Sequence, residues 1–134
     1  MPRIDINGLS IAYDLIGEGD KAITITPGGR FSRDTPGVRE LAQELAQHGF
    51  KVLIWDRPNT GESDLCFDGE CESFQNADTL AGMIRALGLG KPLVYGASGG
   101  SREALLCAIR HPDLVSGVMC QWLSGGGIGI ATLP

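Results

Sequence analysis

Residues 96–100 have the sequence Gly-Ala-Ser-Gly-Gly, and they are the part of the chain best suited to chemistry. They fit the pattern Gly-x-Ser-x-Gly, with an apolar run before it and a helical pattern after it. Gly96 and Gly100 suit so tight a turn because side chains two positions from the serine would have no room. The helix that follows would direct its first N–H groups toward developing negative charge. The pattern predicts that Ser98 is a nucleophile for acyl transfer and that the N–H of Gly99 is an oxyanion donor.

Two other interpretations of this segment stay open. A strand-to-helix turn can be rich in small residues without doing any chemistry. Ser101 is a second candidate nucleophile by residue type. It falls at the start of the predicted helix, however, and is interpreted as a helix cap.

Residues 26–31, Thr-Pro-Gly-Gly-Arg-Phe, follow a predicted strand and form the second candidate segment. Gly29 has no side chain, so its backbone N–H can approach a ligand closely. We expect that N–H to be the second oxyanion donor. Arg30 and Phe31 could line a substrate pocket. Taken alone, a Gly-Gly pair after a strand is usually only a turn.

A serine nucleophile of this kind needs an imidazole base that is held by a carboxylate. The chain has two histidines, His48 and His111. His48 is expected at the end of the first helix, and His111 at the end of the helix that starts beside Ser98. That helix of about ten residues is about 15 Å long, which places His111 out of hydrogen-bond reach. Neither histidine is expected to act on Ser98.

The segments around these residues alternate between strand and helix patterns after an initial hairpin. Asn7-Gly8 suits a type I′ turn, because both central residues of that turn need positive φ. The predicted strands are residues 3–6, 9–14, 22–26, 51–55, 92–95 and 115–122. The first predicted helix starts at Thr35-Pro36 and has one buried face. The other two predicted helices cover residues 77–87 and 101–110. This order predicts an α/β fold in one domain over residues 1–134, with a mostly parallel sheet and helices on both faces.

The composition favours a soluble protein that acts on small molecules. Charged residues make up 20% of the chain and the net charge is -5, which gives no electrostatic reason to bind nucleic acid or a membrane surface. No stretch is long enough to span a membrane. The first residues alternate polar and apolar types, unlike a secretory signal. A cytoplasmic location is therefore expected.

The four cysteines are expected to be reduced and structural. Cys107 and Cys120 lie in apolar segments and are interpreted as buried thiols. Cys66 and Cys71 have no nearby histidine, which makes them a weak metal signal. The sequence therefore predicts neither a metal nor a cofactor.

Three aromatic residues lie at or near predicted strand ends: Phe31, Trp55 and Trp122. Each could line a pocket. Aromatic side chains in such places are more often part of the core, and that is the interpretation preferred for all three.

The order of these motifs resembles that of the α/β-hydrolase superfamily along nearly the whole chain. Residues 56–63, Asp-Arg-Pro-Asn-Thr-Gly-Glu-Ser, are similar to the family's loop D-x-R-G-x-G-x-S. They depart from it because Pro58-Asn59 replaces the Arg-Gly pair and Arg57 comes one place early. Three further segments are similar to the family in order and spacing: residues 87–89, 96–100 and 111–113. Pro27-Gly28-Gly29 stands where many members of the family have His-Gly-x, and the donor expected there is a backbone N–H.

The resemblance implies the N-terminal part of an α/β-hydrolase core that lacks its last strands and lid. The family's triad runs in the order Ser, Asp or Glu, then His, so the acid and the histidine would lie beyond Pro134. Relatives that open epoxides or remove halide have an aspartate at the elbow. Ser98 therefore implies hydrolysis of an ester, thioester, amide or C–C bond. A complementary C-terminal chain, or another copy of this chain, would cover the open edge of the sheet.

Three hypotheses follow from these observations. The preferred one is a serine hydrolase completed by a second polypeptide, because the elbow is well formed while the sheet is truncated. The lack of a usable histidine favours a non-catalytic binding module or pseudoenzyme of the same fold. The third is a truncated or proteolytic fragment of an ordinary monomeric hydrolase, which the intact mass of the source protein would reveal.

Overall fold

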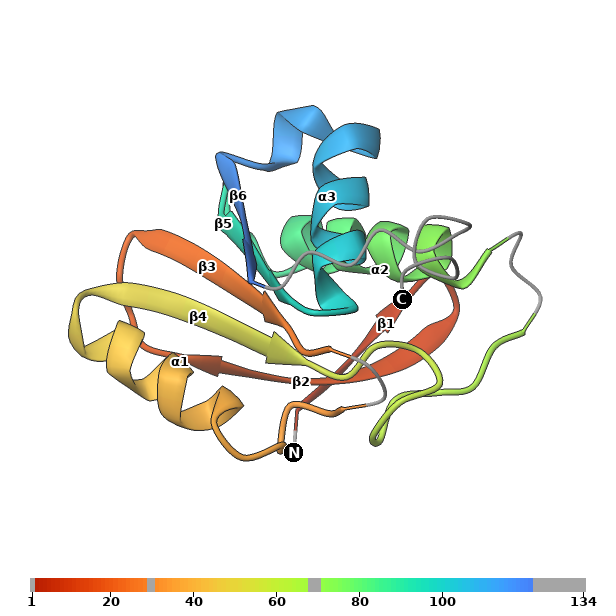
Figure 1. Cartoon of the computed structure of the whole chain (residues 1–134), viewed down its shortest axis with the longest axis horizontal. Helices are drawn as coiled ribbons and strands as arrows, with labels where there is room; N and C mark the ends of the chain where they lie inside the picture. The colour runs from red at the N-terminus through yellow and green to blue at the C-terminus, as the bar shows by residue number, and fades with distance from the viewer. Residues whose placement is uncertain (1, 29–30, 68–70, 122–134) are drawn as a thin grey trace, which may run out of the picture.

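The computed structural model describes residues 2–28, 31–67 and 71–121. Within these residues an N-terminal hairpin is followed by strands that alternate with helices (Figure 1). The strands are β1 (Arg3–Ile6), β2 (Leu9–Ile16), β3 (Lys21–Thr26), β4 (Phe50–Trp55), β5 (Leu93–Ala97) and β6 (Gly117–Gln121). The helices are α1 (Val38–Gln47), α2 (Glu72–Ala86), α3 (Gly100–Arg110) and the short 3-10 helix η1 (Pro112–Leu114).

The strands form one mixed sheet in the order β1-β2-β4-β3-β5-β6. The pairs β1–β2 and β2–β4 are antiparallel. β3 pairs in parallel with β4 and with β5, and β5 pairs in parallel with β6. The carboxyl ends of β3, β4 and β5 therefore meet at one edge, where ligands bind in open sheets of this class. The predicted hairpin and mostly parallel sheet are confirmed.

Helices cover both faces of the sheet, and the alternating side chains of β4 explain why. Val52 and Ile54 belong to the core cluster that contains Ala42 of α1. Leu53 and Trp55 belong to the cluster on the opposite face, with residues of α2 and α3. All four β4 side chains are fully buried. A strand that is buried on both faces has a continuous run of apolar residues, and this run is the signal that predicts a strand at residues 51–55.

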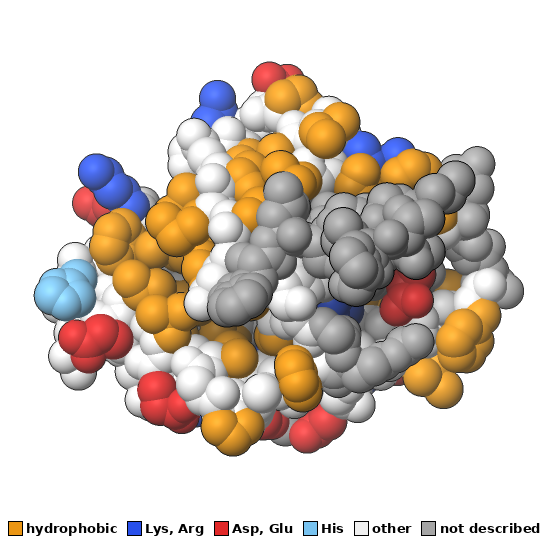
Figure 2. Space-filling model, in the orientation of Figure 1, with side chains coloured by type: hydrophobic (Ala, Val, Ile, Leu, Met, Phe, Trp, Pro, Cys, Tyr) orange, Lys and Arg blue, Asp and Glu red, His pale blue; other side chains and the backbone are white. Residues whose placement is uncertain are grey.

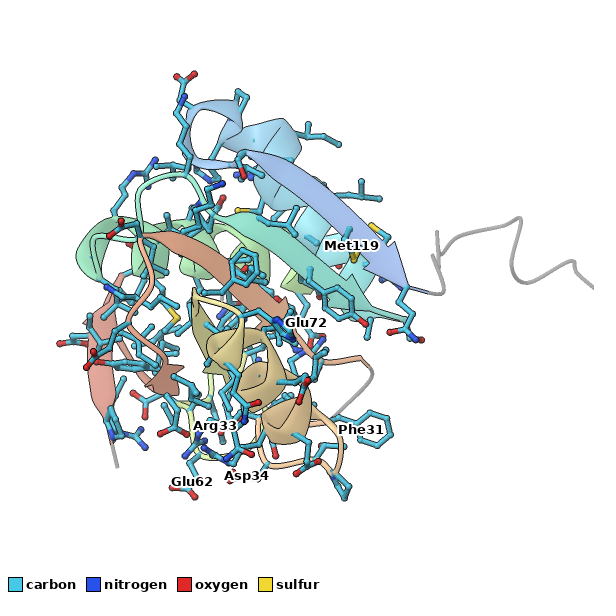
Figure 3. All side chains as sticks on the ribbon, turned by 90° about the vertical axis from the view of Figure 1, so that its left-hand side faces the viewer. Phe31, Arg33, Asp34, Glu62, Glu72 and Met119 are labelled. Carbon is cyan, nitrogen blue, oxygen red and sulfur yellow. The ribbon has the colours of Figure 1, made fainter. Side chains whose placement is uncertain are left out.

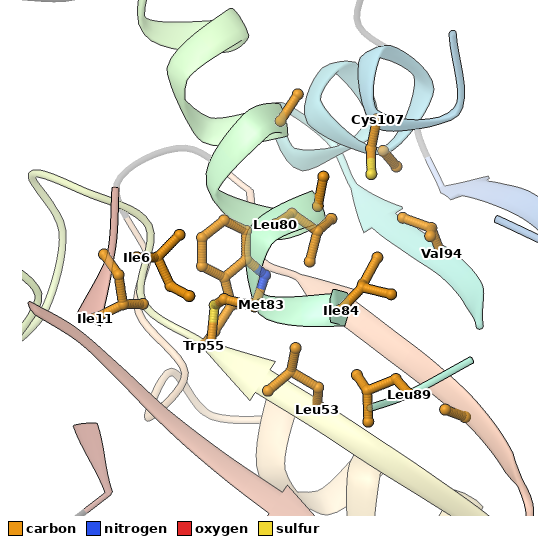
Figure 4. Close-up of a cluster of buried hydrophobic side chains, with 14 residues drawn as sticks. Ile6, Ile11, Leu53, Trp55, Leu80, Met83, Ile84, Leu89, Val94 and Cys107 are labelled. Atoms are coloured by element: carbon orange, nitrogen blue, oxygen red, sulfur yellow. The ribbon is translucent and has the colours of Figure 1, made fainter. Parts of the chain in front are cut away.

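The larger core cluster lies between the sheet and α2 (Figure 4). Leu80 and Met83 of α2 are fully buried, as are Leu53 and Trp55 of β4. The indole Nε1 of Trp55 donates to Thr26 Oγ1 at 3.1 Å, which satisfies the polar atom of this ring inside the core. The interpretation of Trp55 as a core residue is confirmed, while Trp122 lies outside the described residues.

The first helix starts later than the sequence predicts. α1 begins at Val38, so the prediction that Pro36 occupies its first position is wrong. Gly37 has φ 98, outside the helical region, and its N–H donates to the Glu40 carboxylate. The Gly37 turn thus comes between the proline and the helix, and the acidic side chain in the first turn satisfies an N–H that the helix leaves open.

The second helix starts earlier than predicted, at Glu72 instead of Ala77. Its first turns are polar, and buried Asn76 and Thr79 contribute no apolar periodicity. A search for apolar spacing therefore detects only the half of α2 that packs on the sheet. β6 is shorter than predicted and begins at Gly117.

The face of α1 that was expected to be buried is only partly covered. Ala42 is fully buried, but Leu41 is 37% exposed. A hollow of about 170 Å³ lies beside α1, with Val38, Leu41 and Tyr95 in its lining. Figure 2 shows hydrophobic side chains gathered between α1 and β6 on this side of the molecule.

The four cysteines are free thiols. Cys107 is buried, and burial raises its pKa to about 11, as expected for an inert structural thiol. Cys120 is only half-buried because it lies on β6, the last strand of the described sheet, so its interpretation as a buried thiol is wrong.

Candidate active site

Ser98 occupies a sharp turn between β5 and α3. Its φ is 50°, in the left-handed region that residues with a side chain seldom adopt, and its side chain is exposed. A Cβ on Gly96 would lie 2.2 Å from the carbonyl oxygen of Gly100, so no side chain fits there. The turn has the shape that the Gly-x-Ser-x-Gly pattern predicts: it presents one hydroxyl beyond the carboxyl end of the central strands.

The end of β3 packs directly against this turn. A Cβ on Gly100 would lie 2.3 Å from the Thr26 carbonyl oxygen, and one on Gly28 would lie 2.6 Å from the Ala97 carbonyl oxygen. The Gly28 position would also be 3.0 Å from Ser98 Cβ. Glycines on both segments therefore allow the backbone after β3 to approach Ser98 closely.

The hydroxyl of Ser101 points inward, and it does not cap α3. It donates to the Gly96 carbonyl oxygen at 3.1 Å and lies 3.4 Å from the Gln121 carbonyl oxygen. Gly99 occupies the cap position, without a side-chain bond. The interpretation of Ser101 as a cap is therefore wrong. Its full burial leaves Ser98 as the exposed hydroxyl of the turn.

The loop after β3 carries the predicted second oxyanion donor. The N–H of Phe31 donates to the Gly28 carbonyl oxygen at 3.0 Å, which closes a turn beside the elbow. Gly29 and Arg30, predicted as donor and pocket residue, lie outside the described residues. Phe31 is 60% exposed and projects away from the sheet (Figure 3), so its interpretation as core is wrong.

A polar pocket of about 430 Å³ opens beside the elbow, between α3, the first turn of α2 and the loop after β4. Gly99, whose N–H is the predicted oxyanion donor, is part of its wall. The other lining residues are Arg57, Cys71, Glu72, Ser73, Arg102 and Glu103. None of these six was predicted as a pocket residue from the sequence. The start of α2 and residue 99 are far apart in the chain, and no local sequence pattern indicates that they lie side by side. Two cations and two carboxylates favour a polar ligand group here.

The loop at residues 56–63 is organised by one buried carboxylate. Asp56 accepts hydrogen bonds from the backbone N–H groups of Arg33, at 2.7 Å, and Glu62, at 2.9 Å, and forms an ion pair with the Arg33 guanidinium. A Cβ on Gly61 would lie 2.2 Å from Asp56 Oδ2. Ser63 donates to the Asp56 carbonyl oxygen at 2.6 Å and accepts the N–H of Ala12. The motif residues therefore hold the loop, and none of these contacts involves Ser98.

Both histidines lie away from Ser98. His111 follows the last residue of α3, at the opposite end of that helix from Ser98, and its Nε2 lies 2.8 Å from Asp78 Oδ1. His48 ends α1, with its Nε2 3.6 Å from Glu44 Oε1. The expectation that neither serves Ser98 as a base agrees with these positions.

The described part of the chain contains no group of three or more His, Cys, Asp or Glu side chains arranged to hold a metal ion. It also contains no helix long and apolar enough to cross a membrane.

The sheet order and the serine turn agree with comparisons to known proteins. The family model described as alpha/beta hydrolase fold matches residues 27–121. The chain belongs to the α/β-hydrolase family. This match covers the loop after β3, the Asp56 loop, the elbow and β6.

Individual α/β-hydrolases are similar to this chain at modest identity. A 2-hydroxy-6-oxononadienedioate/2-hydroxy-6-oxononatrienedioate hydrolase from Burkholderia vietnamiensis is 30% identical over 122 residues, which are 90% of this chain and 41% of that protein. The human serine hydrolase BPHL is 29% identical over 119 residues, or 84% of this chain and 39% of that protein. A thermophilic esterase from Thermogutta terrifontis is 26% identical with a TM-score of 0.79, over 90% of this chain and 45% of that one. The chain therefore spans about two fifths of the length of the curated relatives it matches.

Proposed function

We propose that this chain carries the nucleophile and the oxyanion donors of a serine hydrolase. The observation that supports this most is the backbone of Ser98, with positive φ and an exposed hydroxyl at the meeting point of β3, β5 and α3. In the proposed reaction a histidine base takes the proton of the Ser98 hydroxyl while its oxygen attacks a carbonyl carbon. The bond from that carbon to the leaving group then breaks, the leaving group receives the proton, and an acyl-enzyme remains. Water hydrolyses the acyl-enzyme, which releases a carboxylic acid and restores the Ser98 hydroxyl. The N–H groups of Gly29 and Gly99 stabilise the negative charge on the carbonyl oxygen.

The proposed base and acid are a histidine and a carboxylate outside these 134 residues. His48 and His111 are both engaged elsewhere, with Glu44 and with Asp78. A base must reach the serine hydroxyl directly or through one water, and neither does. We therefore propose that a complementary region, on the same polypeptide or on a second one, completes the triad.

The proposed substrates are carbonyl compounds with a polar substituent. The pocket beside Gly99 contains two arginines and two glutamates, which suits a polar group better than a long alkyl chain. The relative from Burkholderia vietnamiensis is named for a dienedioate and the neighbour from Thermogutta terrifontis is an esterase. Both C–C and ester hydrolysis are within reach of an acyl-enzyme mechanism, so both substrate classes belong in the test.

The test uses the intact protein that contains this chain, treated with a fluorophosphonate probe and assayed with p-nitrophenyl esters and a 2-hydroxy-6-oxo-dienoate. We expect the probe to label Ser98, and Ser98→Ala to abolish labelling and to lower turnover by at least about 10³-fold. Ser116→Ala, an exposed serine before β6, is the control and should leave both unchanged.

Absence of labelling in the intact, folded protein would overturn this proposal. It would favour a non-catalytic binding module with the same fold, for which the distance of both histidines from Ser98 is the supporting observation. The intact mass of the source protein shows whether the rest of the triad belongs to the same polypeptide.

A further inference from the structure

The polar pocket beside the elbow contains two arginines, and one of them is used within the fold. Arg57 is only 4% exposed. Its Nη2 donates to the carbonyl oxygens of Gly28, at 3.3 Å, and Phe31, at 3.4 Å. Its Nη1 lies 3.9 Å from Glu103 Oε1 on α3. The charge of Arg57 is therefore already compensated, and its donors are directed at the loop after β3.

The two glutamates of the pocket are engaged as well. Glu103 is 5% exposed, and its Oε1 also accepts a hydrogen bond from Asn76 Nδ2 at 3.1 Å. A carboxylate is retained at such depth only when hydrogen bonds and an opposite charge offset the loss of water. Glu72, in the first turn of α2, also has an interaction partner. Neither glutamate is therefore an open position for a positively charged ligand.

Arg102 is the remaining charged side chain of this pocket. It is exposed, and within the described residues its guanidinium has neither a hydrogen bond nor an ion pair. Its backbone N–H donates to the Gly99 carbonyl oxygen at 3.3 Å, so the two residues lie one turn apart on the same side of α3. The rise over three helical residues is about 5 Å. A substrate group bound by Arg102 would therefore lie only a few bonds from a carbonyl at Ser98.

Two helix ends add to the attraction for a negatively charged group. Cys71 and Gly99 are the N-cap residues of α2 and α3, and both line the pocket. Among the described residues, no side-chain hydrogen bond caps either helix at these positions. The first N–H groups of a helix have no partner inside the helix, and its N-terminus carries a partial positive charge. Both helix ends thus favour the same kind of ligand as the Arg102 guanidinium.

We propose that Arg102 is a specificity-determining residue: it binds a carboxylate of the substrate, a few bonds from the carbonyl group that Ser98 attacks. A planar guanidinium matches a carboxylate through two parallel hydrogen bonds, which an amide with its single oxygen does not accept. The net charge of the chain is -5, so recognition of an anion depends on this local arrangement. The inference rests on the proposed function and narrows its substrates from polar carbonyl compounds to those that carry a carboxylate.

The experiment compares substrates that differ only in this charge, in the intact protein that contains the chain. One pair carries the group on the acyl side: p-nitrophenyl hydrogen adipate, and p-nitrophenyl adipamate, in which an amide replaces the carboxylate. The other pair carries it on the leaving group: 4-acetoxybenzoate and 4-acetoxybenzamide. We expect a higher kcat/KM for the carboxylate in at least one pair, and we expect Arg102→Gln to lower that preference about tenfold.

Two further variants control for charge and for geometry. Arg102→Lys keeps the positive charge without the planar fork, and it should retain only part of the preference. Lys91→Gln removes one positive charge from an exposed position before β5, at the opposite end of that strand from the elbow. It should leave the preference unchanged. Because Arg102 is exposed, its replacement should also leave the unfolding temperature nearly unchanged.

Alkylation of Cys71 gives a second measurement that does not need turnover. This exposed thiol lines the same pocket, and the reagents iodoacetate and iodoacetamide differ in one carboxylate. The ratio of their rates does not depend on how much of the thiol is ionised, so it reports the local attraction for a carboxylate. We expect Arg102→Gln to lower the ratio of iodoacetate to iodoacetamide rates about threefold, and Lys91→Gln to leave it unchanged.

An unchanged preference in both substrate pairs, or an unchanged alkylation ratio, in Arg102→Gln would overturn the carboxylate site. Ser98-dependent turnover of neutral and charged esters alike would then leave the proposed function standing. A wild-type protein without Ser98-dependent turnover would instead overturn the proposed function, and the alkylation ratio would still decide whether Arg102 attracts a carboxylate.

Discussion

At Gly96 and Gly100 the shape of the elbow depends on the absence of side chains. The serine reaches its exposed position because backbone atoms occupy the space where two side chains would otherwise be. Ser101 then fixes the turn from inside, through its bond to the Gly96 carbonyl oxygen. The geometry of the Ser98 turn is thus set by neighbouring residues and not by the serine itself.

Substitution of Gly96 tests this steric argument. Gly96→Ala places a methyl group 2.2 Å from a backbone oxygen, so the elbow must shift. We expect a loss of about 1–3 kcal/mol in the free energy of unfolding, and loss of fluorophosphonate labelling at Ser98. The control is Gly117→Ala on β6, where the new methyl group would meet the end of a flexible side chain, Leu93 Cδ1, at 3.3 Å. Similar labelling of the two variants would contradict the argument.

Polar contacts connect the middle of α2 to the C-terminal end of α3, away from the elbow. Asp78 of α2 accepts hydrogen bonds from Arg110 Nε and Nη2, both at 2.9 Å, and also contacts His111. The bonds from Arg110, with a smaller contribution from His111, lower the pKa of Asp78. The connection keeps α3, and with it the serine turn, in a fixed relation to the rest of the core.

Asp78→Asn should weaken this connection in a pH-dependent way. Because the folded pKa of Asp78 is lowered, its stabilisation is complete above the unfolded value of about 4 and is lost as the pH falls through the folded value. At pH 7 we expect the variant to be less stable by about 0.5–1 kcal/mol, since the pair is partly exposed. The difference should shrink below pH 4 in urea unfolding series. Exposed Asp113→Asn is the control, and a difference that is constant from pH 7 to pH 2 would contradict the assignment.

The elements that the sequence predicts well are those whose signal is local. The buried run of β4 and the Gly-x-Ser-x-Gly turn are examples, since each is specified by neighbouring residues. The start of α2 is missed because its first turns are polar. The Arg57 contacts are missed for a stronger reason: Gly28, Phe31 and Glu103 come from separate elements, which only the packing of β3, β4 and α3 brings together.

The two faces of the whole molecule are covered unequally. Of the helices in the described residues, α2 and α3 cover one face, whereas α1 covers part of the other and leaves a hollow that Tyr95 helps to line. β6 lies at the end of the described sheet, and Met119 on it is 51% exposed (Figure 3). Exposed apolar surface beside a terminal strand favours association with another chain.

The isolated 134-residue chain should therefore self-associate through this region. We expect sedimentation velocity to show a concentration-dependent increase in mean mass, and Met119→Lys to lower the apparent association constant by about tenfold, because a charge on a terminal strand opposes pairing. Gln47→Lys on the exposed surface of α1 changes the net charge equally and serves as the control. A chain that is monomeric at all concentrations, or an equal effect of both variants, would contradict this prediction.

The pairing of Thr26 with Gly96 has a consequence for how the site comes into being. α1, β4 and α2 all lie between these partners along the chain, so β3 and β5 can meet only after a long loop has closed. Contacts of this kind form late, because the entropy of closure is lost before any contact compensates for it. A partly folded chain with its hairpin and helices in place would still lack the β3 backbone against which the serine turn is shaped. We therefore expect the turn at Ser98 to reach its native geometry only after β3 and β5 have paired.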